Sequence, residues 1–449
     1  MIRPIRIELR RSNATTVALL LIVIGGLVLA TMYGFWRGQW LRFGYAQTTT
    51  MFILVPLALA GGAALGRRDR RAHTEDLMNS TGRPGWQRTL PAMSALGIGV
   101  AVAHLLVLAV GAILIAVPGS YLGLRGFAAP LIDVLILIGA AWTGVAAGRR
   151  WSSALLPPAL AAGVLVLQFG AQAVSVDPNR LQNLSLMIIY PPDAPWETVS
   201  TPALLGRLAL AAGLLLAGVL LAAGRSWPRR AGAGAALAAG VAGLLLITAP
   251  GPAGRWQIDP AAHRLVCADG TPQVCVAAVH EHLLPHVTTE ARRALAAIAK
   301  LPNAPTRAVE VRLDTPGVHD SEQWQRKAPE PGTVHFALNP DPDTGQDPDV
   351  ADSIAMGGGM WWNGCGANID DKAMSVVGAW LLGTETVRMW DPVFGDMFAS
   401  RTEAAVRDGV RALRALPERE QLRRVTAVRD AAARCERELM PILTGEAAS

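Results

Sequence analysis

Residues 67–88 read RRDRRAHTEDLMNSTGRPGWQR, a polar and strongly basic stretch with a long apolar run on each side. A segment this hydrophilic cannot lie in the hydrocarbon core of a bilayer. Each flanking run can cross that core, because a transmembrane helix needs about 20 predominantly apolar residues. The stretch is therefore expected to be a loop between two membrane-spanning helices, which predicts a multi-pass α-helical membrane protein.

The composition of the chain supports this expectation. Of its 449 residues, 51% are hydrophobic and 17% are charged, which is more apolar than an ordinary soluble domain. Residues 1–250 contain 20 arginines, no lysine and eight acidic residues, whereas residues 251–449 contain 21 basic and 27 acidic residues. A basic membrane domain followed by an acidic soluble domain is predicted. No basic stripe with interleaved aromatic residues is present, so nucleic acid is not an expected partner.

Seven apolar segments of membrane length follow one another in the first part of the chain. The first contains VALLLIVIGGLVLA (17–30) and is not followed by an A-x-A cleavage site, so we expect an anchor rather than a removed signal peptide. The transmembrane domain is thus predicted over residues 15–250 and a further domain over residues 251–449. The predicted spans are residues 15–36, 48–66, 91–117, 128–147, 154–176, 202–224 and 231–250.

The arginines predict the orientation of the spans. With the N-terminus in the cytoplasm, the short cytoplasmic segments hold 15 arginines and the segments outside hold five, with Arg207 counted among the latter at a span edge. This is the bias expected from the positive-inside rule. Because seven spans are an odd number, residues 251–449 are expected outside a bacterial plasma membrane.

The cysteines agree with that location. All four lie in the second half of the chain, at Cys267, Cys275, Cys365 and Cys435. An even number confined to one soluble region indicates disulfides and an oxidising compartment. Of the three possible pairings, the short spacing favours Cys267–Cys275, which leaves Cys365–Cys435.

Residues 251–449 have the pattern of a small α+β domain. The stretch HRLVCADGTPQVCVA (263–277) predicts a hairpin with Asp269–Gly270 in its turn. A helix is expected at 288–301 and strands are expected at 307–314 and 333–339. Further helices are predicted near 368–383, 402–416 and 418–440.

The basic loop itself has the pattern of a short amphipathic helix. Thr74 is a suitable N-cap, and Glu75 and Asp76 follow in the first turn, where carboxylates favour the helix dipole. Leu77 and Met78 are the aliphatic side chains of this helix. Exposed aliphatic residues at a membrane face need a surface to pack against, either the lipid or a protein partner.

Two stretches resemble a known family. The N-terminal RIELRRS (6–12) and the loop at 67–88 are similar to the elbow helix and the coupling helix of type-2 ABC transporter permeases. The resemblance covers about residues 1–225. It implies an elbow segment at 1–14, a homodimer or heterodimer of permeases, and a coupling loop at 67–90. In that loop, Glu75, Asp76, Leu77 and Met78 would contact a separate P-loop ATPase.

The chain departs from the family pattern, whose members usually end after six spans. The seventh span and residues 251–449 are extra, and the latter are similar to a domain of some actinobacterial permease-like membrane proteins. The chain contains no G-x-x-x-x-G-K-[ST] motif, so ATP is expected to bind to a partner. We therefore predict no enzymatic activity in this chain.

No cofactor or metal is expected in the chain. The stretch HEHLLPH (280–286) lacks the second histidine of an H-E-x-x-H zinc site, because Leu284 occupies that position. His282 and His286 have the spacing of one helical face, but Pro285 lies between them. No complete set of catalytic residues is evident.

Four polar residues are predicted inside the membrane. His104 and Asp133 fall at similar depths on neighbouring spans, where they would form a pair, or Asp133 would reach the headgroups and His104 would be a hydrogen-bonded core residue. Gln168 and Gln172 are four residues apart and share a helix face. Interhelical hydrogen bonds are favoured for them over the lining of a path.

These observations predict a permease-like membrane subunit of an ABC exporter. The alternative is a membrane-anchored extracytoplasmic sensor or enzyme that uses the spans as a scaffold.

Overall fold

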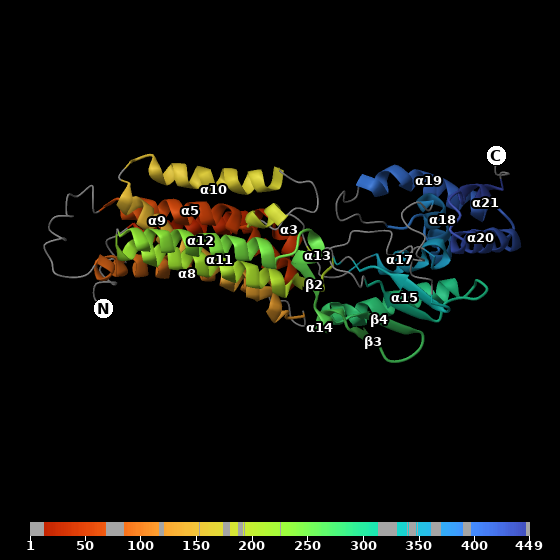
Figure 1. The fold of residues 1–449 in the computed structure, drawn as a ribbon. Helices are drawn as coiled ribbons and strands as arrows, with labels where there is room; N and C mark the ends of the chain where they lie inside the picture. Colours follow the sequence, from red (N-terminus) through yellow and green to blue (C-terminus); the bar gives the residue numbers. More distant parts are fainter. Residues whose placement is uncertain are drawn as a thin grey trace. The chain divides into compact units, whose positions relative to one another are not determined.

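The computed structural model divides into two compact units (Figure 1). The helical unit contains most of the residues up to Asp259, and the C-terminal unit begins at Pro260. The described residues are 13–68, 85–115, 121–151, 153–173, 180–186, 192, 194–224, 226–312, 330–338, 340, 347, 349–360, 370–388 and 397–445.

Among the described residues of the helical unit, six helices are long and apolar enough to cross a membrane. They coincide with six of the predicted spans, so the chain is a multi-pass helical membrane protein. The first predicted span was too long, because its helix ends at Thr31 and a separate short helix, α3 (Tyr33–Trp36), follows. The six helices are α2 (Ala14–Thr31), α8 (Gly85–Ile115), α9 (Ala128–Arg150), α10 (Leu156–Ala173), α11 (Thr201–Ala223) and α12 (Trp227–Ile247).

A pair of consecutive helices forms a further candidate span. Helix α4 (Trp40–Thr49) and helix α5 (Met51–Gly66) are bent by 40° at their junction, and together they pass the same test of length and apolarity. The predicted span at 48–66 covers α5 alone. Helix α4 was missed because Arg42 and the polar run at 47–50 interrupt the apolar pattern of the sequence.

Helices α5 and α9 pack through facing glycines. A Cβ atom on Gly62 or Gly66 would overlap a backbone carbonyl of α9, and a Cβ atom on Gly144 or Gly148 would overlap a backbone carbonyl of α5. Each helix therefore carries a G-x-x-x-G pattern directed at the other, the arrangement that brings membrane helices into backbone contact. Figure 1 shows α5, α9, α11 and α12 running alongside one another, with α10 at the margin of the bundle.

Short elements close one end of this bundle. Strands β1 (Glu197–Val199) and β2 (Trp256–Ile258) pair antiparallel, with Glu197 opposite Ile258. The remaining short elements of the helical unit are η1 (Leu124–Phe127), η2 (Arg180–Leu184) and α13 (Pro252–Arg255). Two of the connections predicted to lie outside therefore carry short ordered elements: η1 lies between α8 and α9, and both η2 and β1 lie between α10 and α11.

The C-terminal unit is built on a four-stranded sheet with the order β3-β4-β5-β6. The predicted hairpin forms β3 and β4, which pair antiparallel, whereas β4–β5 and β5–β6 pair parallel. Sequence patterns suggested an α+β unit and did not reveal these parallel pairs, because strand direction depends on the path of the connections. The strands are β3 (Leu265–Cys267), β4 (Gln273–Ala277), β5 (Arg307–Glu310) and β6 (Thr333–Phe336).

Helices cover one face of this sheet. Val274, Ala308 and Val334 lie side by side on three neighbouring strands and belong to the core beneath these helices. This core includes Leu295 and Met374, which are nearly inaccessible to solvent. The helical elements of the unit are α14 (Pro260–His263), η3 (Ala278–Leu283), α15 (Leu284–Ile298), α17 (Val350–Ala355), η4 (Met356–Gly358), α18 (Asp371–Leu382), α19 (Met397–Arg414), α20 (Glu418–Ala433) and α21 (Met440–Thr444).

One of the two predicted disulfides is confirmed. Cys267 and Cys275 are directly opposite each other in the hairpin and are bonded. The turn between them contains Gly270 at a φ of 93°, a conformation that glycine adopts without strain. Cys435 is disulfide-bonded as well, but Cys365 lies outside the described residues, so the pairing Cys365–Cys435 stays a prediction.

Candidate functional site

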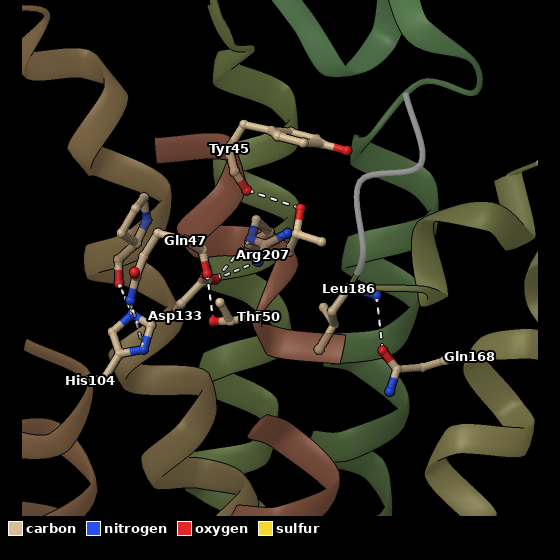
Figure 2. Close-up of polar contacts among 10 residues, drawn as sticks. Tyr45, Gln47, Thr50, His104, Asp133, Gln168, Leu186 and Arg207 are labelled. Atoms are coloured by element: carbon tan, nitrogen blue, oxygen red, sulfur yellow. Dashed lines mark hydrogen bonds and ion pairs between the residues drawn. The ribbon is translucent and has the colours of Figure 1, made fainter. Parts of the chain in front are cut away.

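A polar run marks the bend between α4 and α5. Gln47, Thr48 and Thr50 are completely buried. The hydroxyl group of Thr50 donates a hydrogen bond to the backbone carbonyl oxygen of Gln47 at 2.7 Å (Figure 2). The hydroxyl group of Thr49 donates one to the backbone carbonyl oxygen of Tyr45 at 3.1 Å. Threonines bonded back to their own helix favour bending, so the local sequence accounts for the change of direction.

An ion pair lies inside the bundle beside this bend. Asp133 on α9 and Arg207 on α11 are buried, and the Nε and Nη2 atoms of the guanidinium lie 3.1 and 2.5 Å from Oδ1 of the carboxylate (Figure 2). Among the described residues, the second carboxylate oxygen, Oδ2, has no hydrogen-bond partner. A buried pair of this kind is strongly held, since neither charge has water to solvate it.

His104 on α8 joins the same layer but does not pair with Asp133. Its Nε2 atom lies 3.2 Å from the carbonyl oxygen of Pro130, and both ring nitrogens lie 3.5 Å from the amide nitrogen of Gln47. Because the carbonyl can only accept, Nε2 carries the proton. The predicted alternative of a hydrogen-bonded core histidine describes these contacts, while the carboxylate of Asp133 is bound by Arg207.

The two glutamines of α10 tie this helix to its neighbours. Gln168 donates to the carbonyl oxygen of Phe52 at 3.2 Å and accepts from the backbone nitrogen of Leu186 at 3.3 Å. Gln172 donates to the hydroxyl oxygen of Ser185 at 2.7 Å. The bond between Gln168 and Phe52 joins α10 to α5, as predicted for an interhelical hydrogen bond, whereas Ser185, the partner of Gln172, follows η2 and is not part of a helix.

Gln168 has a specific task at Phe52. Pro56 lies inside α5 and has no N–H group, so the carbonyl oxygen four residues earlier, that of Phe52, lacks its helical donor. The side chain of Gln168 supplies a donor from another helix. In a bilayer such a carbonyl has to be satisfied within the protein, and this accounts for a buried glutamine on a helix of which little is buried.

Arg207 is the functional candidate that sequence reasoning missed. It was counted with the arginines outside the membrane, but it lies in the second turn of α11 and its side chain is buried. Asp133 and Arg207 are the sixth and seventh residues of their helices, about 7.5 and 9 Å from each helix start. The sequence did contain a signal for this pair: two residues of opposite charge lie at similar depth on two spans that cross the membrane in the same direction.

The edges of two of the loops predicted to be cytoplasmic, 67–90 and 148–153, meet at one end of the bundle. Arg67, at the end of α5, donates a hydrogen bond to the carbonyl oxygen of Ala154, in the connection between α9 and α10. At the opposite end, Asn183 bonds the carbonyl oxygen of Thr248 and the side chain of Arg255. This grouping agrees with the predicted alternation of the loops.

The predicted partner-binding residues Glu75, Asp76, Leu77 and Met78 lie outside the described residues, as does most of the predicted elbow segment at 1–14. The described residues contain no group of three or more His, Cys, Asp or Glu side chains placed to hold a metal ion. His280 pairs with Glu310 at 2.7 Å, and His286 bonds the carbonyl oxygen of Asp347. These two histidines of the HEHLLPH stretch thus have different partners.

Comparison with family models, with curated proteins and with solved structures finds no match to this chain.

Proposed function

We propose that this chain is the permease-like membrane subunit of an ABC exporter and that a separate ATP-binding subunit docks on the loop at 67–90. The permease would act as a homodimer or a heterodimer. Hydrolysis of ATP would take place in the partner, since the chain has no phosphate-binding loop in its sequence.

The polar layer formed by Gln47, Thr50, His104, Asp133 and Arg207 carries this proposal. Charges inside an apolar bundle are costly, and where they occur they usually serve a path or a moving part. The layer lies at the break between α4 and α5, nearer to the starts of α9 and α11 than to their middles. Broken helices that meet polar groups inside the membrane are a feature of transporters. A bundle that served only as an anchor would need neither.

The end of the bundle at Arg67 supports the proposed docking position. The segments 67–68 and 153–155 lie at this end, and both belong to the arginine-rich loops of the sequence. A soluble ATPase has to reach the permease from the cytoplasmic side. The positive-inside rule assigns arginine-rich loops to that side.

The location of the C-terminal unit is part of the proposal. If the bent pair α4–α5 counts as one span, the helical unit has seven spans. The N-terminus and the C-terminal unit would then lie on opposite sides of the membrane. A disulfide between Cys267 and Cys275 is suited to the oxidising side.

Affinity purification in a mild detergent tests the proposal. The tagged chain, isolated from its native host, should retain a P-loop ATPase. The triple variant Glu75→Ala, Asp76→Ala, Leu77→Ala should lose this partner while remaining in the membrane, because it removes the carboxylates and one of the two aliphatic side chains of the docking helix.

A matched control changes the other arginine-rich loop. The double variant Trp151→Ala, Ser153→Ala alters two exposed residues and should keep the ATPase. Retention of the ATPase by the triple variant, or absence of any ATPase from the wild-type preparation, would argue against the proposed coupling and favour a function that resides in the C-terminal unit.

A further inference from the structure

The C-terminal unit contains a cavity of about 130 Å³ on the face of its sheet that points away from the core. Val309 and His335 are neighbours on β5 and β6 and alternate with the core residues Ala308 and Val334. The cavity therefore lies on the side of the strands that carries Val309 and His335, opposite Ala308 and Val334. It is lined by Leu265, Arg307, Val309, Glu310, Arg312, Glu330 and His335.

The buried carboxylate in this lining is already engaged. One oxygen of Glu310 lies 2.7 Å from Nδ1 of His280, and the other accepts a hydrogen bond from the backbone nitrogen of Ala277 at 2.7 Å. Arg312 uses one nitrogen, Nη1, to bond the carbonyl oxygen of His263. Glu310 thus offers little to a ligand, while Arg312 retains further donors.

Arg307 is the cationic group with the most unused capacity. Its buried Nε atom has no hydrogen-bond partner among the described residues. Its Nη2 atom has a weak contact with Sγ of Cys275 at 3.8 Å. A guanidinium with unused N–H groups matches a carboxylate, which can accept two parallel hydrogen bonds from it.

The lining of the cavity also contains an exposed carboxylate. Glu330 is exposed and comes just before β6, so its carboxylate can receive a cationic group. His335 adds a ring nitrogen to the lining. A ligand that satisfies both regions has a carboxylate at one end and an ammonium group at the other.

The size of the cavity limits that ligand. A volume of 130 Å³ is well below the roughly 300–1,000 Å³ of sites for drug-sized molecules, and it exceeds the share of a single water, about 30 Å³. We propose that the C-terminal unit binds a small α-amino acid, with its carboxylate on Arg307 and Arg312 and its ammonium group at Glu330. This site is separate from the proposed transport function and does not depend on it.

Calorimetric titration of the full-length chain in detergent tests the site. Glycine and L-alanine should bind with saturation. The affinity for acetate should be lower than that for glycine by a factor of about ten or more. Methylammonium and inorganic phosphate should not bind. The Arg307→Met variant should weaken glycine binding by about tenfold or more, because it removes charged hydrogen-bond donors to the carboxylate. The control Arg411→Met, at an exposed position on α19, should bind as the wild type does.

A second variant keeps the test decisive if Arg307→Met fails to fold. Glu330 is exposed, so Glu330→Gln should fold normally, weaken the binding of glycine and leave that of acetate unchanged. Absence of glycine and alanine binding to the wild type would overturn the proposal. So would tighter binding of acetate or phosphate than of amino acids, or equal glycine affinity in the wild type and Glu330→Gln.

Discussion

Asp133 and Arg207 illustrate how a membrane protein places charge in an apolar bundle. Each side chain lies on a different helix, and each neutralises the other where water is excluded. The pair therefore acts as a specific link between α9 and α11. Such a link does more for the choice of helix neighbours than for net stability, because removing both charges from water is costly.

Replacing one partner of this pair should destabilise the protein more than replacing both partners by apolar residues. Asp133→Asn leaves Arg207 buried without its counter-charge and should lower the free energy of unfolding by about 3–5 kcal/mol. The double variant Asp133→Leu, Arg207→Leu should recover much of this loss. Unfolding of the detergent-solubilised chain measures both.

The control for this experiment is an exposed pair. Glu403→Gln on α19 removes one of the two exposed carboxylate partners of Arg407, the other being Glu385, and should cost under about 1 kcal/mol. A double variant that is as unstable as Asp133→Asn would contradict the interpretation of the buried pair.

The carboxyl group of Asp371 should make the stability of the C-terminal unit depend on pH. Burial at the start of α18, and next the charge of Asp370, raise the pKa of Asp371 from 3.8 to about 6. Because the folded-state pKa is the higher one, the stability contributed by Asp371 is present below about pH 4 and is lost as the pH rises through about 6.

Asp371→Asn should abolish this dependence. The difference in unfolding free energy between the variant and the wild type should grow in favour of the variant from about pH 4 to pH 7. Urea unfolding followed through the NMR signal of a fluorinated Trp380, which lies on the same helix, provides the measurement. A difference that stays constant with pH would show that Asp371 titrates alike in both states.

At the scale of elements, the prediction from sequence was good where a long pattern existed. The spans were located to within a few residues because each is a run of about 20 predominantly apolar residues. The hairpin followed from Asp269–Gly270 between two alternating stretches. Helix α4 was missed because polar residues interrupt its apolar pattern. The parallel strand pairs were missed because strand direction depends on tertiary contacts.

The candidate site was predicted less well than the fold. His104, Asp133, Gln168 and Gln172 were recognised as polar residues in apolar runs. Their partners were not, because Phe52, Leu186 and Pro130 contribute backbone atoms that carry no signal in the sequence. Arg207 was missed because it lies close to the start of its span.

The contact between α10 and α5 leads to a prediction about two residues together. Gln168→Leu should cost about 0.6–2 kcal/mol, the range for hydrogen bonds between membrane helices. In a Pro56→Ala background the cost should be smaller, because the new N–H group of Ala at this position can bond the carbonyl oxygen of Phe52. Thermal unfolding of the four proteins gives the coupling energy.

Gln172→Leu is the matched control. Its side chain bonds Ser185 and not α5, so its effect should be the same with and without Pro56. Equal costs of Gln168→Leu in both backgrounds would contradict the role that we assign to this glutamine.

At the scale of the whole molecule, a helical unit and a mixed-sheet unit follow each other along one chain. The first is basic and apolar, and the second is acidic and stapled by a disulfide. These properties suit a membrane and an oxidising compartment, respectively. The proposed topology, with seven spans and the C-terminal unit outside the cytoplasm, accounts for both properties.

Reporter fusions test the topology. Alkaline phosphatase, which is active only outside the cytoplasm, should be active when fused after residue 449 and inactive when fused after residue 226, between α11 and α12. Green fluorescent protein at the N-terminus should be fluorescent. An inactive phosphatase after residue 449 would show that the number of spans is even.

The facing glycines of α5 and α9 have a mechanical consequence. With backbone against backbone at Gly62, Gly66, Gly144 and Gly148, no side chain can change rotamer to let one helix slide along the other. The two helices are therefore expected to move as one rigid body. Any motion that opens a passage past the buried ion pair therefore has to move other helices relative to α5 and α9, and α10 is the least buried of the candidate spans in the described part of the chain.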